Sequence, residues 1–222
     1  AKTIYEKNKQ IINGKTDCYV IPRHIDESLF YNIDKTVIQN DCQAPVLAKE
    51  IIKKYKHIFF FPSRPIEEKG GQYLKELSEE LNKKLDDYCI MGPLDEDADL
   101  PDNFINTGWI KSEELKYYYS ISDATLNFSS LPESFSQVCI ESTICGTPIV
   151  SFKSGNIPNL SKLIDSAILV EKNTKSILEG INIAFKLKAN KEQVEKTKEV
   201  IRRNFETKKV INDYMKLYKK YM

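Results

Sequence analysis

The apolar residues of this 222-residue chain fall into short, nearly uninterrupted runs separated by stretches with helical spacing. Runs of this kind are typical of parallel strands that are buried on both faces. Between the first two runs, Leu74, Leu77 and Leu81 recur at intervals of three and four and predict one apolar helix face. The pattern predicts strands over about 57–61, 87–91, 103–106, 124–128, 149–152 and 167–170, with a short strand at 18–21.

The stretches around these runs predict helices. Residues 33–46 have no clear period and are expected to form a loop. Strands that alternate with helices indicate an α/β fold, here a Rossmann-like parallel sheet with helices on both faces. Ligands of such sheets bind beyond the carboxyl ends of the strands. Helices are predicted over about 1–13, 48–55, 72–84, 112–120, 174–187, 191–203 and 206–221.

The segment 130–152 has the pattern of a loop, a helix, a helix stop and a strand. Ser134 and Ser136 are both common N-cap residues, so the helix is expected to begin between them. Gly146 lies where a left-handed C-cap residue would fall, and Pro148 prevents continuation. The N-terminus of this helix, with its unpaired N–H groups and partial positive charge, is suited to bind a phosphate.

Two carboxylates flank the expected phosphate site. Glu133 precedes the helix, and Glu141 lies about two turns inside it, roughly 8–10 Å along the axis. Glu141 can accept hydrogen bonds from ribose hydroxyls, and Glu133 can bind hydroxyls of a sugar beyond a diphosphate. Acids at both ends of an anion site suit a nucleotide-sugar. Glutamates at this spacing also occur on ordinary amphipathic helices, so the pair alone leaves a structural role open.

A second candidate site follows the strand predicted at 57–61. Arg64 and Lys69 lie five residues apart in a loop that leads into a helix. Arginine can bind phosphate oxygens in pairs, and lysine acts as a point charge. The two cations can therefore meet on one anion, although solvated loop cations have the same pattern.

These motifs together resemble the retaining GT-B glycosyltransferases of the large family 4 type, the glycosyl transferases group 1. Glu133, Glu141, Gly146 and Pro148 match the family signature E-x7-E-A-x-x-x-G-x-P-V-V, with Ser142 in place of alanine. The signature is therefore present with one departure.

Three further segments carry the resemblance. Residues 63–70 match G-R-x-x-x-x-K-G, with Ser63 in place of the first glycine. Residues 20–30 resemble the V-I-P-N-G-I-D-x-x-x-F crossover between two domains, with Arg23 and His24 in place of Asn-Gly. The turn after residue 153 resembles G-G-x-x-E, with Asn159 in the acidic place, which weakens a ligand role for this turn.

The resemblance implies a role for each matching residue. Arg64 and Lys69 would hold the donor diphosphate, Glu133 would orient the donor sugar, and Glu141 would hold the ribose. Ile110 would meet the nucleotide base through its backbone, and Trp109 beside it can stack or pack, with packing the default expectation. The catalytic set is then Arg64, Lys69 and Glu133, and the donor-binding set is Ile110, Ser134, Phe135, Ser136, Gln137 and Glu141.

The resemblance also implies how the chain is divided. Residues 1–20 would end a missing N-terminal acceptor domain and its linker, and 21–205 would form the nucleotide-sugar-binding domain. Residues 206–222 would form a C-terminal helix that returns to the other domain. The donor would be UDP- or GDP-linked, the transfer would retain anomeric configuration, and no metal or other cofactor is expected. The isolated segment is expected to bind donor and transfer little.

Composition narrows the class of protein. Hydrophobic content of 41% with 29% charged residues is ordinary for a globular domain. A net charge of +1 provides no strong field for nucleic acid. No apolar run reaches the length of a transmembrane helix. Five cysteines without a C-x-x-C motif favour a reducing cytoplasm and make zinc an unexpected ligand.

Partners and alternatives follow from the same comparison. The full-length protein would be a bacterial enzyme of polysaccharide or lipid-linked glycan synthesis. Its acceptor would bind to the missing domain. A peripheral association with the inner face of the membrane is left open. One alternative is a non-catalytic nucleotide-sugar or protein interaction domain. Another is a nucleotide-sugar epimerase or a dehydrogenase on the same architecture, and the lack of G-x-G-x-x-G disfavours the dehydrogenase.

Overall fold

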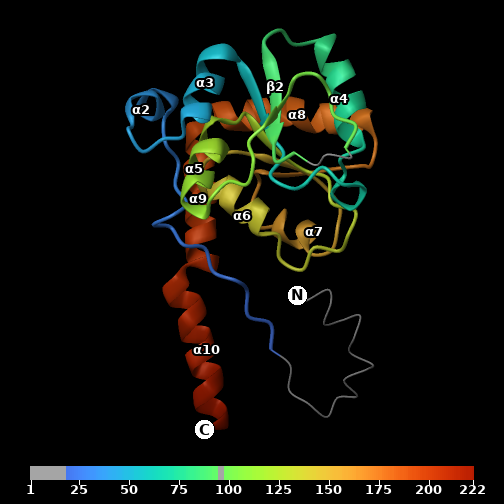
Figure 1. Cartoon of the computed structure of the whole chain (residues 1–222). Coiled ribbons are helices and arrows are strands. Elements are labelled where there is room, and N and C mark those ends of the chain that lie inside the picture. The colour runs from blue at the N-terminus through green and yellow to red at the C-terminus, as the bar shows by residue number, and fades with distance from the viewer. Residues whose placement is uncertain (1–18, 95–97) are drawn as a thin grey trace.

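The strands form one parallel sheet with the order β3-β2-β1-β4-β5-β6. Figure 1 shows the whole chain, with the helices around this sheet. The computed structural model describes residues 19–94 and 98–222, so the helix predicted over 1–13 lies outside the described residues. The strand order reverses between β1 and β4, and this reversal creates the kind of crevice where α/β sheets bind ligands. The strands are β1 His57–Phe60, β2 Tyr88–Gly92, β3 Phe104–Asn106, β4 Ala124–Asn127, β5 Ile149–Phe152 and β6 Ala167–Val170.

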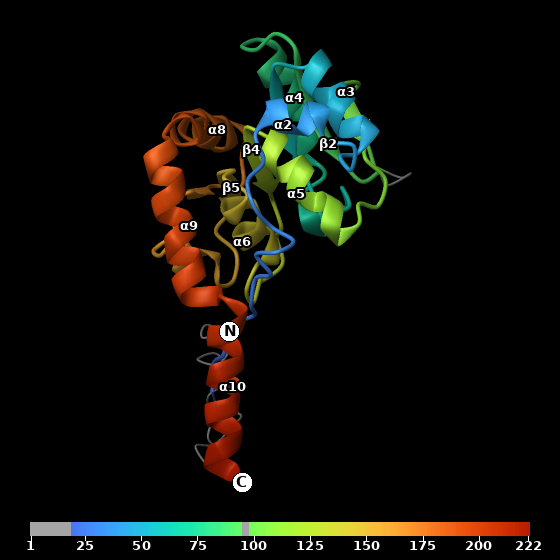
Figure 2. The same ribbon diagram turned by 90° about the vertical axis from the view of Figure 1, so that its left-hand side faces the viewer.

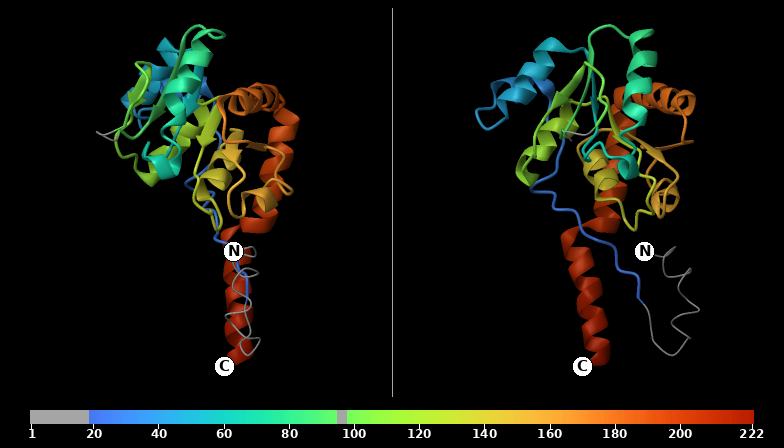
Figure 3. Two further views of the ribbon diagram at one scale, coloured as in Figure 1. Left: turned by 90° about the vertical axis from the view of Figure 1, so that its right-hand side faces the viewer. Right: turned by 45° about the vertical axis from the view of Figure 1, so that its right-hand side comes forward.

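The helices lie on both faces of the sheet, which confirms the predicted α/β class (Figures 2 and 3). Alternate side chains of β1 point to opposite faces, as a strand requires. Ile58 and Phe60 join the core that α5, α6 and α9 cover, whereas Phe59 and Phe61 join the core under α4 and α8. The helices are α2 Lys35–Asn40, α3 Val46–Lys54, α4 Tyr73–Asn82, α5 Ser112–Ile121, α6 Gln137–Ile144, α7 Ile157–Leu160, α8 Thr174–Ala189, α9 Lys191–Phe205 and α10 Thr207–Tyr221, with a 3-10 turn, η1, at Glu67–Lys69.

Two local predictions were wrong. The loop expected over 33–46 contains α2, whose N-cap Asp34 accepts a hydrogen bond from the backbone N–H of Thr36 at 2.8 Å. Only Ile38 of this helix is buried, so the sequence shows no period there. The strand expected at 18–21 is absent from its described residues, 19–21, which have irregular backbone.

The last helix, α10, projects from the body of the domain (Figures 1 and 2). Residues 19–21 run beside it, and Tyr19 Oη lies 2.9 Å from Tyr221 Oη. Further on, Ile25 N–H donates to the Phe205 carbonyl at 2.9 Å, and Thr207 Oγ1 donates to the Ile25 carbonyl at 3.2 Å. These bonds attach the crossover segment to the junction of α9 and α10. Within the described ranges, none of the helices has the length and apolarity needed to cross a membrane.

Candidate functional site

Two loops meet at the switch point of the sheet. Strands β1 and β4 are parallel neighbours, so the loops that follow them leave the same edge. The loop after β1 ends in η1 with Lys69, and the loop after β4 carries Glu133. Lys69 Nζ lies 3.2 Å from Glu133 Oε1, and both side chains are partly buried. The structure therefore brings together two predicted site residues that are 64 positions apart.

Glycines allow the close backbone approach that holds this pair. Gly70 has a left-handed φ of +86°, and a Cβ there would lie 2.3 Å from Phe128 Cβ. Gly155 has φ +54°, and a Cβ there would lie 2.2 Å from the Glu133 carbonyl oxygen. Asn156 N–H donates to the same Glu133 carbonyl at 2.7 Å. The backbone next to Lys69 and the backbone of Glu133 are thus each packed against another loop, at a contact where only glycine fits.

The N-terminus of α6 borders the Lys69–Glu133 pair. Its N-cap Ser136 has φ +60° and ψ +80°, a left-handed conformation that is unusual for serine, and its side chain makes no capping hydrogen bond. The first N–H groups of α6 are thus left without a side-chain cap. Gln137 Oε1 is buried, and no hydrogen-bond donor is found for it in the described part of the chain. A strained backbone with unpaired polar groups is characteristic of a ligand-binding terminus.

A cavity of about 260 Å³ lies at this point. It gathers Lys69, Glu133 and the predicted backbone run from Ser134 to Gln137. The Phe135 side chain packs edge-on against Phe205 at 5.3 Å between ring centroids, so only the Phe135 backbone is suited to face a ligand. The complete lining is Arg23, Ser63, Lys69, Asn127, Glu133, Ser134, Phe135, Ser136, Gln137 and Val138.

Glu141 lies behind this cavity, on the inner side of α6. Tyr119 Oη donates a hydrogen bond to Glu141 Oε2 at 3.0 Å. Burial raises the pKa of the Glu141 carboxyl, and the hydrogen bond from Tyr119 and the charge of Arg23 oppose that rise. Glu141 is therefore a partly buried acceptor that lies outside the lining of this cavity.

Two other predicted residues lie outside the cavity lining. The Arg64 side chain is exposed, and its neighbour Ser63 lines the cavity instead. Ile110 follows β3 and packs partly buried against the core. Trp109 is 82% exposed, so the default expectation that it packs is wrong. An exposed indole beside Ile110 remains available to stack on a base.

Sequence reasoning missed four lining residues: Arg23, Ser63, Asn127 and Val138. Ser63 lies just after β1 and Asn127 ends β4, so the rule that ligands bind at the carboxyl ends of strands could have found both. Asn127 Nδ2 donates to Ser151 Oγ at 3.1 Å, which orients its amide. Arg23 was noticed only as a departure from Asn-Gly.

Ser142, which replaces the alanine of the family pattern, makes contacts inside the fold. Ser142 is fully buried, and its hydroxyl lies 2.7 Å from Thr125 Oγ1 and 2.8 Å from the Thr147 carbonyl, to which it can donate. Thr125 belongs to β4 and Thr147 precedes β5, and neither residue is in the cavity lining. The replacement therefore leaves the candidate site unchanged.

Three of the four cysteines in the described ranges are poor candidates for chemistry, and the fourth, Cys42, is exposed. Cys89, Cys139 and Cys145 are buried, and burial raises the pKa of Cys89 and of Cys139 to about 12. Thiols with raised pKa values are unreactive. Across residues 19–94 and 98–222, no group of three or more histidine, cysteine, aspartate or glutamate side chains is placed to hold a metal ion.

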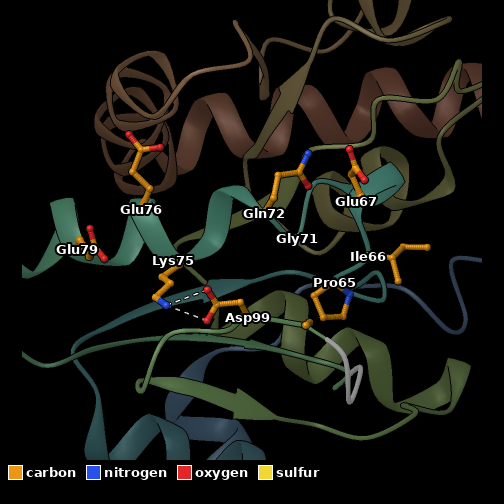
Figure 4. A pocket seen from close by; sticks show the side chains of 10 residues that line it. Pro65, Ile66, Glu67, Gly71, Gln72, Lys75, Glu76, Glu79 and Asp99 are labelled. Carbon is orange, nitrogen blue, oxygen red and sulfur yellow. Dashed lines mark hydrogen bonds and ion pairs between the residues drawn. The ribbon is translucent and has the colours of Figure 1, made fainter.

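A larger cavity of about 620 Å³ lies beside α4 (Figure 4). Its lining includes Glu67, Glu76 and Glu79, and its Lys75 is paired with Asp99 at 2.8 Å. This lining carries more carboxylates than cations and repels a phosphate. The smaller cavity at the switch point is therefore the better candidate site.

A parallel sheet with helices on both faces, and with a cation, a carboxylate and a helix N-terminus at its switch point, defines a Rossmann-like domain with a candidate ligand site. The sequence profile of the family described as "Glycosyl transferases group 1" matches residues 46–203. The chain belongs to this family, and its fold is that of the C-terminal half of a GT-B glycosyltransferase.

Individual relatives are distant. The chain is 20% identical over 224 residues to an N-acetyl-alpha-D-glucosaminyl L-malate synthase of Bacillus anthracis, covering 97% of this chain and 57% of that protein. A solved sucrose-phosphate synthase of Thermosynechococcus elongatus matches with a TM-score of 0.77 at 18% identity, over 100% of this chain and 57% of that one. Anabaena Alr3699/HepE, solved in complex with UDP and glucose, matches with a TM-score of 0.69 at 15% identity, over 96% and 60%. The chain thus spans little more than half the length of these relatives.

Proposed function

We propose that this chain is the donor-binding domain of a glycosyltransferase that takes a UDP- or GDP-linked sugar. The observation that carries the proposal is the Lys69–Glu133 pair at the N-terminus of α6. A cation and a helix N-terminus suit a diphosphate, and a carboxylate beside them suits sugar hydroxyls. The UDP and glucose bound to the Anabaena relative belong to that protein, and they supply the ligand class to test here.

In this proposal, the charge that develops on the leaving diphosphate is stabilised by fixed groups of the protein. Lys69 and the first N–H groups of α6 would meet the phosphate oxygens, and Arg64 would reach them from its exposed position in the same loop. Preorganised electrostatics of this kind is usually the largest catalytic contribution. Because these cations neutralise the diphosphate, transfer is proposed to need no metal.

Two carboxylates would position the donor. Glu133 would accept hydrogen bonds from the sugar hydroxyls and orient the anomeric carbon for transfer with retention. Glu141 would accept hydrogen bonds from the ribose, and the Ile110 backbone would meet the base. The acceptor, a glycan or a lipid-linked glycan, is proposed to bind a separate domain of the full-length protein, which we place in the bacterial cytoplasm.

Calorimetric titration of the folded chain with UDP and with GDP tests the proposal. One of the two is expected to bind, and Lys69→Ala is expected to weaken that binding by roughly tenfold to a hundredfold, because a hydrogen bond to a charged group contributes about 1.5–3 kcal/mol. Lys75→Ala is the matched control, since Lys75 pairs with Asp99 outside the cavity. A folded chain that binds neither nucleotide would instead support a non-catalytic domain.

A further inference from the structure

Arg23 occupies a position at the candidate site that none of the motif assignments covers. It belongs to the crossover segment, which precedes the sheet, yet it lines the same cavity as Lys69 and Glu133. Its backbone lies two residues before Ile25, whose N–H and carbonyl are both hydrogen-bonded at the α9–α10 junction. The backbone close to the arginine is therefore anchored, and Arg23 itself is an exposed residue of the cavity lining.

The charges of the cavity lining make Arg23 important. Lys69 is already paired with Glu133 at 3.2 Å, so these two charges neutralise each other. Arg23 forms no hydrogen bond or ion pair within residues 19–94 and 98–222. Of the two cations in the lining, Arg23 is thus the one without a direct ion pair among the described residues, although its charge also acts on Glu141. An anionic ligand entering the cavity meets this charge directly.

Arg23 also interacts electrostatically with Glu141, the proposed ribose acceptor. Burial raises the pKa of the Glu141 carboxyl, and the hydrogen bond from Tyr119 and the charge of Arg23 oppose that rise. Arg23 therefore lies close enough to Glu141, the proposed ribose acceptor, to act on it, while it lines the cavity that holds Lys69 and Glu133. A guanidinium can bind two oxygens at once in a fixed geometry, which suits neighbouring phosphate oxygens.

We propose that Arg23 is a diphosphate-binding residue of the donor site and meets the phosphate on the nucleoside side of the diphosphate. The inference rests on the proposed function. It assigns to the crossover segment a contact that the motif comparison gave to Arg64, whose side chain lies outside the cavity lining. Because the crossover leads to the part of the chain that precedes this domain, donor binding would also hold that connection in one arrangement.

Calorimetric titration of matched variants tests this role. Wild type is titrated with UDP, UMP and uridine, or with GDP, GMP and guanosine if GDP is the nucleotide that binds. Arg23→Ala is expected to weaken diphosphate binding by roughly tenfold to a hundredfold, the effect of losing a hydrogen-bonded charge, and to change nucleoside binding less than about twofold. Arg23→Lys is expected to recover part of the loss. Arg203→Ala, which removes an exposed arginine on α9, is expected to bind as wild type.

The outcomes separate this inference from the function on which it rests. If wild type binds UDP or GDP and Arg23→Ala binds it within about twofold, the role of Arg23 is wrong and the donor site stands. If Arg23→Ala loses diphosphate and nucleoside affinity equally, its role is structural and the inference again fails. If folded wild type binds none of the nucleotides, the proposed function fails, and the assignment of Arg23 fails with it.

Discussion

Lys69 Nζ and Glu133 Oε1 lie 3.2 Å apart although 64 positions separate the two residues in the chain. Their strands are parallel neighbours at the point where the sheet order reverses, so both loops leave the sheet at one edge. The two charges neutralise each other, and in our proposal Lys69 binds phosphate while Glu133 binds sugar hydroxyls. From this pair we make separate predictions for the binding of the nucleotide and the binding of the sugar.

Glu133→Gln is expected to separate these two contributions. Removing the carboxylate frees Lys69 for phosphate, so free UDP or GDP is expected to bind as well as to wild type or several-fold more tightly. The extra affinity contributed by a donor sugar is expected to fall by roughly tenfold, because a charged hydrogen-bond acceptor is lost. Calorimetry with the nucleoside diphosphate and its glucose conjugate measures both. Equal losses for the two ligands would contradict the role of Glu133 in sugar binding.

Glu141→Gln is expected to raise stability while it lowers nucleoside affinity. Burial raises the pKa of Glu141, so above its ordinary pKa the native state holds a proton that the unfolded chain has lost. The free energy of unfolding contributed by this group therefore falls as pH rises through that window. The variant lacks this titrating carboxyl, so its melting temperature at neutral pH is expected to exceed that of wild type.

The binding half of this prediction uses the same variant. An amide is a weaker acceptor for ribose hydroxyls than a carboxylate, so uridine or guanosine affinity is expected to fall by about tenfold. Melting curves from mildly acidic to neutral pH, together with calorimetry, check both effects. A variant that is less stable than wild type at neutral pH would show that ionised Glu141 stabilises the fold.

Gly155→Ala is expected to displace Glu133 and destabilise the domain by about 1–3 kcal/mol. The new Cβ would lie 2.2 Å from the Glu133 carbonyl oxygen and 2.4 Å from its nitrogen, on a backbone with φ +54°. Gly108→Ala is the matched control, because Gly108 has φ +62° with nothing within 4 Å of the added carbon. Urea unfolding of both variants separates the clash from backbone strain. Equal losses would mean that the contact with Glu133 adds nothing.

Lys188→Met is expected to change the pH dependence of stability. Lys188 Nζ donates to Thr147 Oγ1 at 2.7 Å and to the Ser120 carbonyl at 3.3 Å, and burial lowers its pKa to about 8. Between that pH and about 10.4, the ordinary lysine pKa, the unfolded chain holds a proton that the native state has lost. The free energy of unfolding of wild type therefore rises with pH across this window relative to the variant.

The expected relative gain is up to about 3 kcal/mol across the window, measured by urea unfolding at several pH values. Asp123, Lys35, Cys145 and Lys198 act on the Lys188 ammonium and are present in both proteins, so their own titration largely cancels in the difference. Lys186→Met changes an exposed lysine of the same helix and is expected to leave the pH profile unaltered. A wild-type profile parallel to that of Lys188→Met would contradict the lowered pKa.

Trp109 provides a direct optical test of the base site. It is the single tryptophan of the chain and is 82% exposed. If the base binds beside Ile110, stacking covers the indole face, so quenching of its fluorescence by acrylamide is expected to decrease when UDP or GDP is added. Quenching that is unchanged at a saturating concentration of a nucleotide shown to bind would place the base elsewhere.

The fold was predictable because its signals are local. The apolar runs predicted every strand of the sheet within a residue or two, since parallel strands buried on both faces are apolar throughout. Helix α4 was predicted from Leu74, Leu77 and Leu81, all of which are buried. Helix α2 was missed because a single buried residue, Ile38, cannot produce a period. Gly146 was predicted in a left-handed conformation and has φ +75°.

For the candidate site, the sequence and the tertiary structure each decided a different part. The sequence by itself determined that Lys69, Glu133 and the start of α6 are candidates for one site, because they lie in recognisable motifs, and the structure brings them together. Only the tertiary structure decided which cations line the cavity, placing Arg23 in the lining and Arg64 outside it. The physical reason is that Arg23 is held near α6 by backbone hydrogen bonds between Ile25 and the distant α9–α10 junction, and no pattern within the crossover segment encodes a bond to residues about 180 positions away.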